Sequence, residues 1–437
     1  MSLLSNSRST RLGNSAIYGF ILLFLFTTIF LLPSSMKAAA SIAFAAIVFI
    51  LISLQRPSKF STVKLSRSYL MVMVFLGFSL LAIAAISPWS KTLLFVYVAF
   101  LLVAALLFKD GFYISRRKLK IESLFYTGTT IVIIFETVKN YGVYGASYVS
   151  GAYDKNYFGI IVFLYFTWCW ATNRKFGVLV SLFVAATIGS RNFIIMIALF
   201  ILLDLISLFL RFHSGSISDP KSGRLSPICV FAIFLSMFIL ITAFSFWWSD
   251  NMVGVGTTSY KGSMNDSSNA IRFNSDKYAI EHLLSNPSLF LFGYDNDIIN
   301  AMGIIEAASL NGTETALDGT FFNGFRIVQP HNVILNLLLK EGVLFTAAYF
   351  GLLSFIFATY FRSDNSAYWV PYLFGCMFMH SLLCNYYLIF LLTVLARSQS
   401  SESLSSAVFR NFSEHNVEPI NHSLSSLSMQ NRERFNE

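Results

Sequence analysis

The chain has 437 residues, of which 55% are hydrophobic and only 12% are charged. Soluble domains carry about 25% charged residues, so a soluble fold of this length would lack the polar surface needed to cover its core. The same composition excludes an intrinsically disordered chain, which is poor in apolar residues. The sequence therefore predicts an all-α polytopic membrane protein.

The formal net charge is +9. In a membrane protein such a surplus of Lys and Arg is typical of cytoplasmic loops, so it does not indicate a nucleic-acid partner. The four cysteines, Cys169, Cys229, Cys376 and Cys384, lie in apolar stretches without a CxxC pair or a nearby His. We expect them to be small buried hydrophobic residues, and we expect no metal site and no cofactor.

Apolar runs of the length that crosses a bilayer, about 20 residues, recur along most of the chain. They lie at residues 16–33, 38–54, 69–87, 92–108, 124–138, 157–172, 176–190, 192–210, 228–248 and 342–361. A further run, 368–396, is too long for one span, and Cys384 and Asn385 near its middle favour a turn between two short spans. We therefore expect about 12 transmembrane helices.

The positions of Lys and Arg predict the orientation. With a cytoplasmic N-terminus, 21 of the 31 Lys and Arg residues fall in segments on the cytoplasmic side. The positive-inside rule then places both termini in the cytoplasm. It places the segment 249–330 on the opposite side, which is the periplasm in a Gram-negative bacterium.

The segment 249–330 is by far the longest polar connection, and polar loops longer than about 15 residues are usually functional or disordered. Within it, residues 275–285 have a helical pattern, and residues 254–269 are rich in Gly, Ser and Asn. The predicted organisation has four parts: membrane helices in 1–248, the external loop 249–330, an external helix with further membrane helices in 331–396, and a disordered tail 397–437.

Two arginines on the external side are candidates for binding a phosphate group. Arg191 follows Gly189 and Ser190 between two apolar spans, where backbone donors of a tight turn could join it. Arg272 lies in the long loop just before the predicted helix 275–285. The ordinary alternatives are an interfacial anchor for Arg191 and a solvated loop charge for Arg272.

His331 and Asn332 follow Pro330 at a predicted helix start. Asn332, Asn336 and Lys340 are spaced by four residues and share one helix face, which favours an aqueous pocket at the membrane edge. A histidine there could act as a general base at neutral pH. The ordinary alternative is a histidine that only hydrogen-bonds at the helix start. Gly342 predicts a bend before the next span.

The segment Asp154–Gly159, which includes Asn156, opens another span at the same external side. Its ordinary interpretation is a capped helix start with Tyr157 in the aromatic belt. The chain has no P-loop, no HExxH and no GxSxG motif, and no clustered acid set for a divalent cation. Any enzymatic activity is therefore expected to be independent of metal.

Taken in order, these segments resemble the bacterial superfamily of O-antigen ligases and O-antigen polymerases. The likeness rests on Gly189-Ser190-Arg191, on Arg272 followed by Asn286-Pro287 and Phe292-Gly293, and on His331-Asn332 followed by Glu341-Gly342. It covers roughly residues 150–360. Members often have a further Gly soon after the pair that Glu341-Gly342 matches, whereas Val343-Leu344-Phe345 follows here.

The resemblance implies a glycosyltransferase of the bacterial inner membrane, with a donor glycan on undecaprenyl pyrophosphate. His331 would be the catalytic base, and Arg191, Arg272, Asn332 and Asn156 would bind substrate. The acceptor would be the lipid A core for a ligase, or a lipid-linked repeat unit for a polymerase, which could act with a chain-length regulator. The motifs do not separate these two activities, nor O-antigen from capsule or exopolysaccharide.

We favour a polymerase because each polysaccharide pathway of this type needs its own. A transporter of lipid-linked oligosaccharides is a third alternative. Such a protein is expected to have charged residues deep in many spans and short loops on both sides. This chain instead has few deep charges and one dominant loop.

Overall fold

This computed structural model describes residues 17–33, short stretches between 36 and 48, and residues 120–143, 146–149, 151, 153–214, 225–252, 267–293, 321–322, 325–326, 330–362, 365–379 and 386–398. The predicted spans 69–87 and 92–108 lie outside the described residues. So do Cys384 and most of the predicted flexible stretch and tail.

The described part of the chain is mainly helical, with one two-stranded β-ladder and an isolated antiparallel bridge between Tyr148 and Tyr153. Its helices are the N-terminal helix Ile17–Leu31 with the π-helix η1 (Thr27–Leu31) at its end, α6 (Lys120–Lys139), α7 (Lys155–Ala171), α8 (Lys175–Thr187), α9 (Arg191–Ser214), α10 (Pro227–Met252), α11 (Ser267–Ser285), α12 (Pro287–Phe292), α14 (Val333–Tyr360), α15 (Ser366–Cys376) and the C-terminal helix Tyr386–Ser398. The strands β1 (Phe321–Phe322) and β2 (Phe325–Arg326) pair antiparallel in the long segment between α10 and α14. No pattern in the sequence predicted this ladder.

Four described helices are long and apolar enough to cross a membrane: Lys120–Lys139, Arg191–Phe209, Pro227–Trp248 and Val333–Ala358. Three shorter apolar helices accompany them, at Ile17–Leu31, Lys175–Thr187 and Tyr386–Ser398. By the length and composition of its helices the chain is a helical membrane protein. The expected number of about 12 spans stays a prediction, because much of the region before α6 is not among the described residues.

Local sequence signals explain where several helices begin and end. The Asp154 side chain accepts hydrogen bonds from the backbone N–H groups of Asn156 at 2.7 Å and Tyr157 at 2.9 Å, and so caps α7. Pro227 and Pro287 are the first residues of α10 and α12, where a missing N–H costs nothing. Gly293 ends α12 with a φ of +73°.

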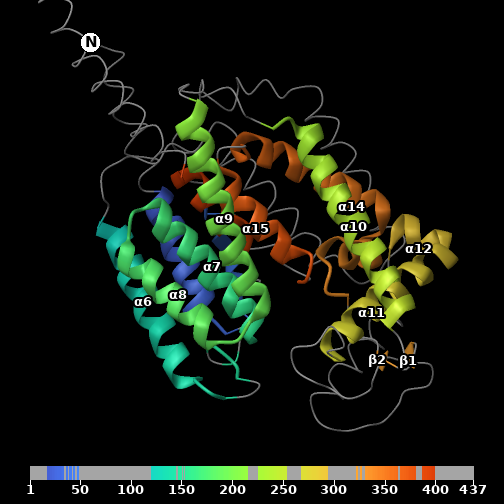
Figure 1. Ribbon diagram of the computed structural model, residues 1–437, viewed down its shortest axis with the longest axis horizontal. Helices are drawn as coiled ribbons and strands as arrows, with labels where there is room; N and C mark the ends of the chain where they lie inside the picture. The colour runs from blue at the N-terminus through green and yellow to red at the C-terminus, as the bar shows by residue number, and fades with distance from the viewer. Residues whose placement is uncertain are drawn as a thin grey trace, which may run out of the picture.

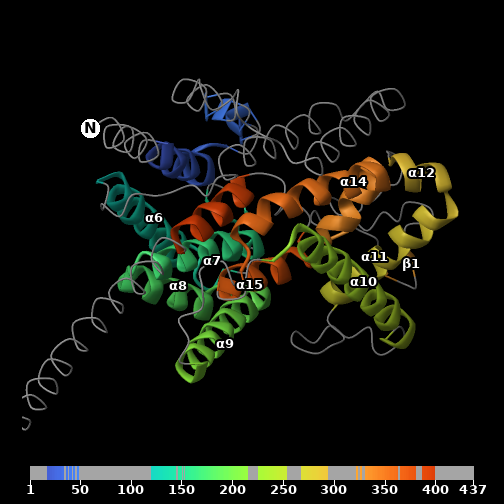
Figure 2. The ribbon, with the colours of Figure 1, turned by 90° about the horizontal axis from the view of Figure 1, so that it is seen from above.

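The helices form two groups joined by α15. Figures 1 and 2 show α6 to α9 on one side of the molecule, and α10, α11, α12 and α14 on the other. α15 packs along α9 and also contacts α7. At its end, Met377 and Phe378 pack against a small cluster formed by Ile241, Trp248 and Phe273 of α10 and α11. The two groups therefore share α15 as a common neighbour.

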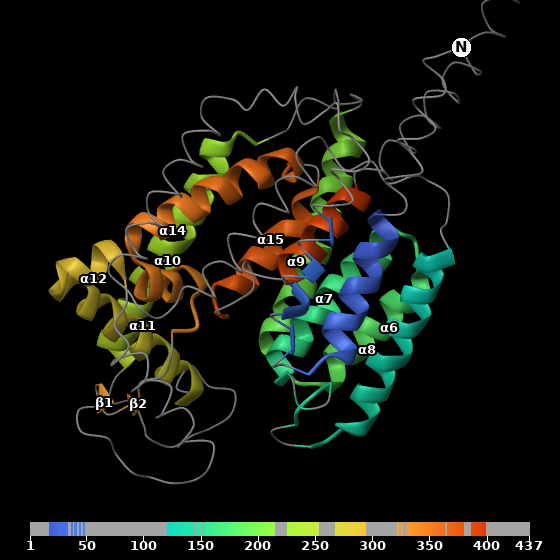
Figure 3. The ribbon, with the colours of Figure 1, turned by 180° about the vertical axis from the view of Figure 1, so that it is seen from behind.

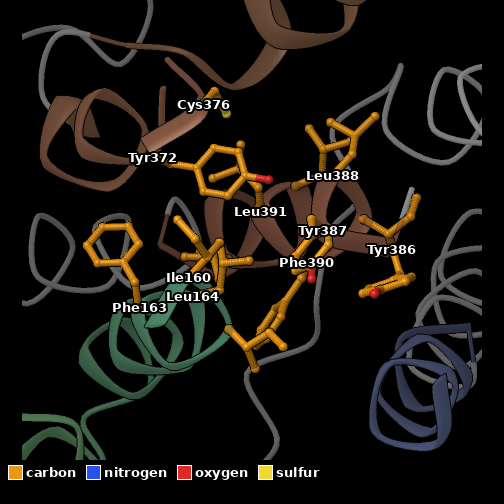
Figure 4. Close-up of a cluster of buried hydrophobic side chains, with 14 of the residues drawn as sticks. Ile160, Phe163, Leu164, Tyr372, Cys376, Tyr386, Tyr387, Leu388, Phe390 and Leu391 are labelled. Atoms are coloured by element: carbon orange, nitrogen blue, oxygen red, sulfur yellow. The ribbon is translucent and has the colours of Figure 1, made fainter. Parts of the chain in front are cut away.

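The centre of the first group is α7, which is buried on nearly all sides from Phe158 to Cys169. Such a helix is surrounded by protein rather than by lipid or water. Figure 4 shows its side chains Ile160, Phe163 and Leu164 against Tyr372 and Cys376 of α15 and against Leu388, Phe390 and Leu391 of the C-terminal helix. The core thus joins segments more than 200 residues apart in sequence.

The outer surfaces of α6, α8, α9 and α10 carry large apolar side chains that are exposed. They include Leu124, Ile131, Phe135, Leu179, Phe183, Leu205, Leu208, Phe209, Ile228 and Leu240. Soluble proteins rarely expose apolar patches of this extent, whereas a bilayer covers them at no cost. This surface agrees with helices that face lipid.

A buried polar network joins four helices at one end of the molecule. Glu122 Oε1 accepts a hydrogen bond from the Tyr18 hydroxyl at 3.0 Å and pairs with Arg397 Nε at 3.3 Å. Trp168 Nε1 donates to the Tyr18 hydroxyl at 3.2 Å. The start of the N-terminal helix therefore lies beside the end of the C-terminal helix, and Figure 3 shows these two helices close together.

One further observation bears on the predicted spans. The run 368–396 forms two helices, α15 and Tyr386–Ser398, as predicted.

The expectation that all the cysteines are buried is wrong for Cys229, which is exposed on α10, whereas Cys169 and Cys376 are buried. One face of an apolar helix can be exposed although its sequence is apolar throughout, so the apolar run around Cys229 did not predict its exposure.

The helix predicted at residues 275–285 begins earlier, at Ser267. Phe273, in the added part, packs against Phe244 with ring centroids 5.0 Å apart and against Trp248 at 5.4 Å. Packing of one helix face stabilises turns that the local sequence alone would leave unformed. Arg272 therefore lies inside α11 and not before it, which corrects the predicted position.

Candidate functional site

Asn156 and Arg191, two of the predicted substrate-binding residues, lie at the neighbouring starts of α7 and α9. The Ser190 hydroxyl donates a hydrogen bond to Asn156 Oδ1 at 3.1 Å, and Arg191 is the first residue of α9. The helices approach closely, because a Cβ added at Gly159 would lie 2.9 Å from Phe193 Cβ. The structure thus joins two motifs that lie 34 residues apart.

The charge at the start of α9 is unusual for a helix. A helix N-terminus carries a partial positive charge and normally attracts acidic side chains. The first turn of α9 has none, and it begins instead with the exposed guanidinium of Arg191. Gly189, with a φ of +62°, forms the tight turn before it. A cation added to a positive helix terminus makes this position attractive to an anion such as phosphate.

Arg272 lies half-buried on α11, one helical turn before Asp276. α11 packs against α10 and also contacts α12, α14 and both strands. Asp276 is only 4% exposed. Burial raises the pKa of Asp276 to about 8, and the charge of Arg272 opposes this rise.

His331 lies half-buried just before α14, and the next residue, Asn332, caps that helix. Asn332 Oδ1 accepts the N–H groups of Ile334 at 2.9 Å and Leu335 at 3.2 Å. Asn332 is 2% exposed, and its side-chain oxygen bonds to the first turn of its own helix. The predicted aqueous polar stripe is wrong in part, because Asn336 is buried as well and Lys340 half-buried.

Replacing Asn332 by alanine removes the cap of α14. We expect a loss of about 1 kcal/mol in the free energy of unfolding, as for other N-cap residues. Asn332→Asp keeps an acceptor oxygen and is the matched control. Thermal melting of the two purified variants in detergent measures the difference. Equal melting temperatures would show that the cap contributes nothing to stability.

The motifs Phe292-Gly293 and Glu341-Gly342 also meet in the structure. Gly342 has φ +75° and ψ 173° inside α14, which confirms the predicted bend. A Cβ added there would lie 2.5 Å from Leu291 O, and a Cβ added at Gly293 would lie 2.5 Å from Glu341 N. The backbones of the two glycines thus pass in direct contact, which fixes α12 against the kink of α14.

The start of α9, which carries Arg191, and α11, which carries Arg272, lie toward the same side of the molecule. In Figures 1 and 3, α9 begins and α10 ends on the lower side, where α11 and the β1–β2 ladder also lie. Arg272 and His331 belong to neighbouring elements, because α11 contacts α14. Asn156 and Arg191 form the second group, on the α7–α9 side. Within the described ranges, no three His, Cys, Asp or Glu side chains gather as a metal site.

Two buried ionisable residues near these groups, Asp276 and Lys37, were not among the predicted residues. The sequence could have indicated Asp276, because it follows Arg272 by four residues and so lies on the same face of their shared helix. No sequence pattern indicated that Lys37 is buried, because a Lys beside an apolar run resembles an interfacial anchor. Its burial depends on residues more than 100 positions away.

The chain matches no protein-family model, no curated protein and no solved structure. Its residues and their geometry therefore carry the functional conclusion.

Proposed function

We propose that the protein is a membrane glycosyltransferase that transfers a glycan from undecaprenyl pyrophosphate at the external face of the bacterial inner membrane. The acceptor is another lipid-linked repeat unit, so that the product is a longer polysaccharide. The observation that carries the proposal is Arg191 at the start of α9, beside Asn156, in a helical membrane protein. An exposed cation on a positive helix terminus suits the phosphate of a lipid-linked donor.

The residues have distinct roles in the proposed reaction. The acceptor hydroxyl attacks the anomeric carbon of the donor sugar, and the bond from that carbon to the pyrophosphate oxygen breaks. His331 accepts the proton of the attacking hydroxyl. Arg191 and Arg272 stabilise the negative charge that develops on the departing undecaprenyl pyrophosphate. The leaving group is already activated, so the reaction consumes no nucleotide.

Deletion of the gene in its host, followed by a gel of the lipopolysaccharide, tests this proposal. A polymerase of O-antigen leaves single repeat units on the lipid core when it is lost, and the ladder of longer chains disappears. A ligase leaves an unmodified core, and long chains accumulate on the lipid carrier. An unchanged ladder would contradict both O-antigen roles and would direct the test to capsule, exopolysaccharide or transport.

A further inference from the structure

Lys37 is a buried lysine that the reaction described above does not use. It is 8% exposed and lies between the predicted spans 16–33 and 38–54. Its Nζ donates a hydrogen bond to the Tyr153 hydroxyl and lies 3.9 Å from the centroid of that ring. The ring centroid of Tyr386 is 5.8 Å away, and the hydroxyls of Tyr153 and Tyr386 are 2.9 Å apart.

The charge of this amine has no counter-ion in the described part of the chain. Burying an ammonium group is costly unless an acid pairs with it, and here the polar partners are neutral tyrosines. Asp154, the residue after Tyr153, directs its carboxylate to the N–H groups of Asn156 and Tyr157. Burial lowers the pKa of Lys37 to about 8, which still leaves most of the amine protonated at pH 7.

Contacts connect Lys37 to the start of α7. Tyr153 lies two residues before the first residue of α7, and Asn156 in its first turn bonds to Ser190, which precedes Arg191. The amine therefore lies at the end of α7 that also contacts the start of α9, where Arg191 is the first residue. Three separate segments, before α7, before α9 and between the first two predicted spans, supply positively charged or polar groups to one end of the bundle.

We propose that Lys37 is a further binding residue for the phosphate or pyrophosphate group of a lipid-linked substrate, held in position by Tyr153 and Tyr386. This inference rests on the proposed function. A pyrophosphate diester bears one negative charge on each of its two phosphates, and each phosphate has several acceptor oxygens, so Lys37 can bind it in addition to Arg191 and Arg272. A lysine ammonium is a compact cation that suits the second phosphate, while Arg191 binds the first.

The test is the affinity of the full-length protein for undecaprenyl pyrophosphate in nanodiscs of neutral phospholipid. Lys37→Met removes the charge and keeps the length of the side chain, and Lys37→Arg keeps the charge. We expect Lys37→Met to raise Kd at least about 10-fold, as for the loss of a hydrogen bond between charged groups. Lys37→Arg should change it less. The control is Lys155→Met, which removes an exposed lysine at the first position of α7 and should change Kd less than about 2-fold.

Competition identifies which anion is bound. Inorganic pyrophosphate that competes in wild type but not in Lys37→Met supports recognition of the headgroup itself. Lys37→Met could instead change the measured affinity only in nanodiscs that contain phosphatidylglycerol. The anion near Lys37 would then be a bulk lipid headgroup, and the proposal would be overturned. A folded Lys37→Met variant with wild-type affinity for undecaprenyl pyrophosphate also overturns it.

A second variant covers the case in which Lys37→Met does not fold. Tyr386→Phe keeps the ammonium but removes one of the hydroxyls that position it, and we expect Kd to rise about 2- to 5-fold. Wild-type affinity in that variant would contradict the positioning role. The proposed function has a separate failure, because a wild-type protein that binds no lipid pyrophosphate would contradict it before Lys37 is considered.

Discussion

Gly342→Ala is expected to destabilise the protein by about 2–5 kcal/mol and to lower its yield in detergent. Two costs combine at this position. The φ of +75° is unfavourable for a residue with a Cβ, and that Cβ would overlap the backbone at Leu291 and Gly293. Gly293→Ala should behave in the same way, because the contact between the two glycines is reciprocal.

Gly151→Ala is the matched control for Gly342→Ala. Gly151 has a similar φ of +82°, but an added Cβ would meet no atom of the described residues within 4 Å. Gly151→Ala should lower the free energy of unfolding only by the conformational cost of a positive φ, about 1–2 kcal/mol. Melting temperatures of the three purified variants measure the difference. If Gly342→Ala and Gly151→Ala melted alike, the close contact between α12 and the kink of α14 would be refuted.

His331→Ala is expected to reduce the rate of glycan transfer about 10²- to 10⁴-fold, the range for loss of a general base. Its effect on stability should be small, because Asn332 and not His331 caps α14. The affinity for undecaprenyl pyrophosphate should be unchanged, since the arginines bind that group. Single-turnover transfer by purified protein, with binding measured separately, distinguishes these effects.

His282→Ala is the control for His331→Ala. His282 is a half-buried histidine of α11, which like His331 lies between α10 and α14, and its ring stacks on Tyr278 with centroids 6.3 Å apart. It has no role in the proposed reaction, so its transfer rate should stay within about 3-fold of wild type. A His331→Ala variant that transfers glycan as fast as His282→Ala would remove His331 from the mechanism.

The helices were largely predictable because apolar composition and capping residues act locally. Residues 192–210 and 228–248 correspond closely to α9 and α10, and the bend at Gly342 was readable from a glycine between two apolar stretches. The start of α11 was missed because contacts of Phe273 with α10 extend the helix beyond its local pattern.

The arrangement of the candidate residues was less predictable. The order of the motifs indicated Arg191, Arg272 and His331, but not that Ser190 bonds to Asn156 or that Gly293 touches Gly342. Such contacts depend on how distant segments pack, and no periodicity encodes them. Lys37 shows the same limit, since a lysine at the end of an apolar run is usually at the membrane surface and is here buried among tyrosines.

The most direct test of the proposed activity is transfer by the purified protein in nanodiscs, with a repeat unit linked to undecaprenyl pyrophosphate as the only substrate. We predict lipid-linked products of two or more repeat units and release of undecaprenyl pyrophosphate in equal amount to the bonds formed. Arg191→Ala should strongly reduce both. A folded wild-type protein that binds this substrate and yields neither product would contradict the proposed activity.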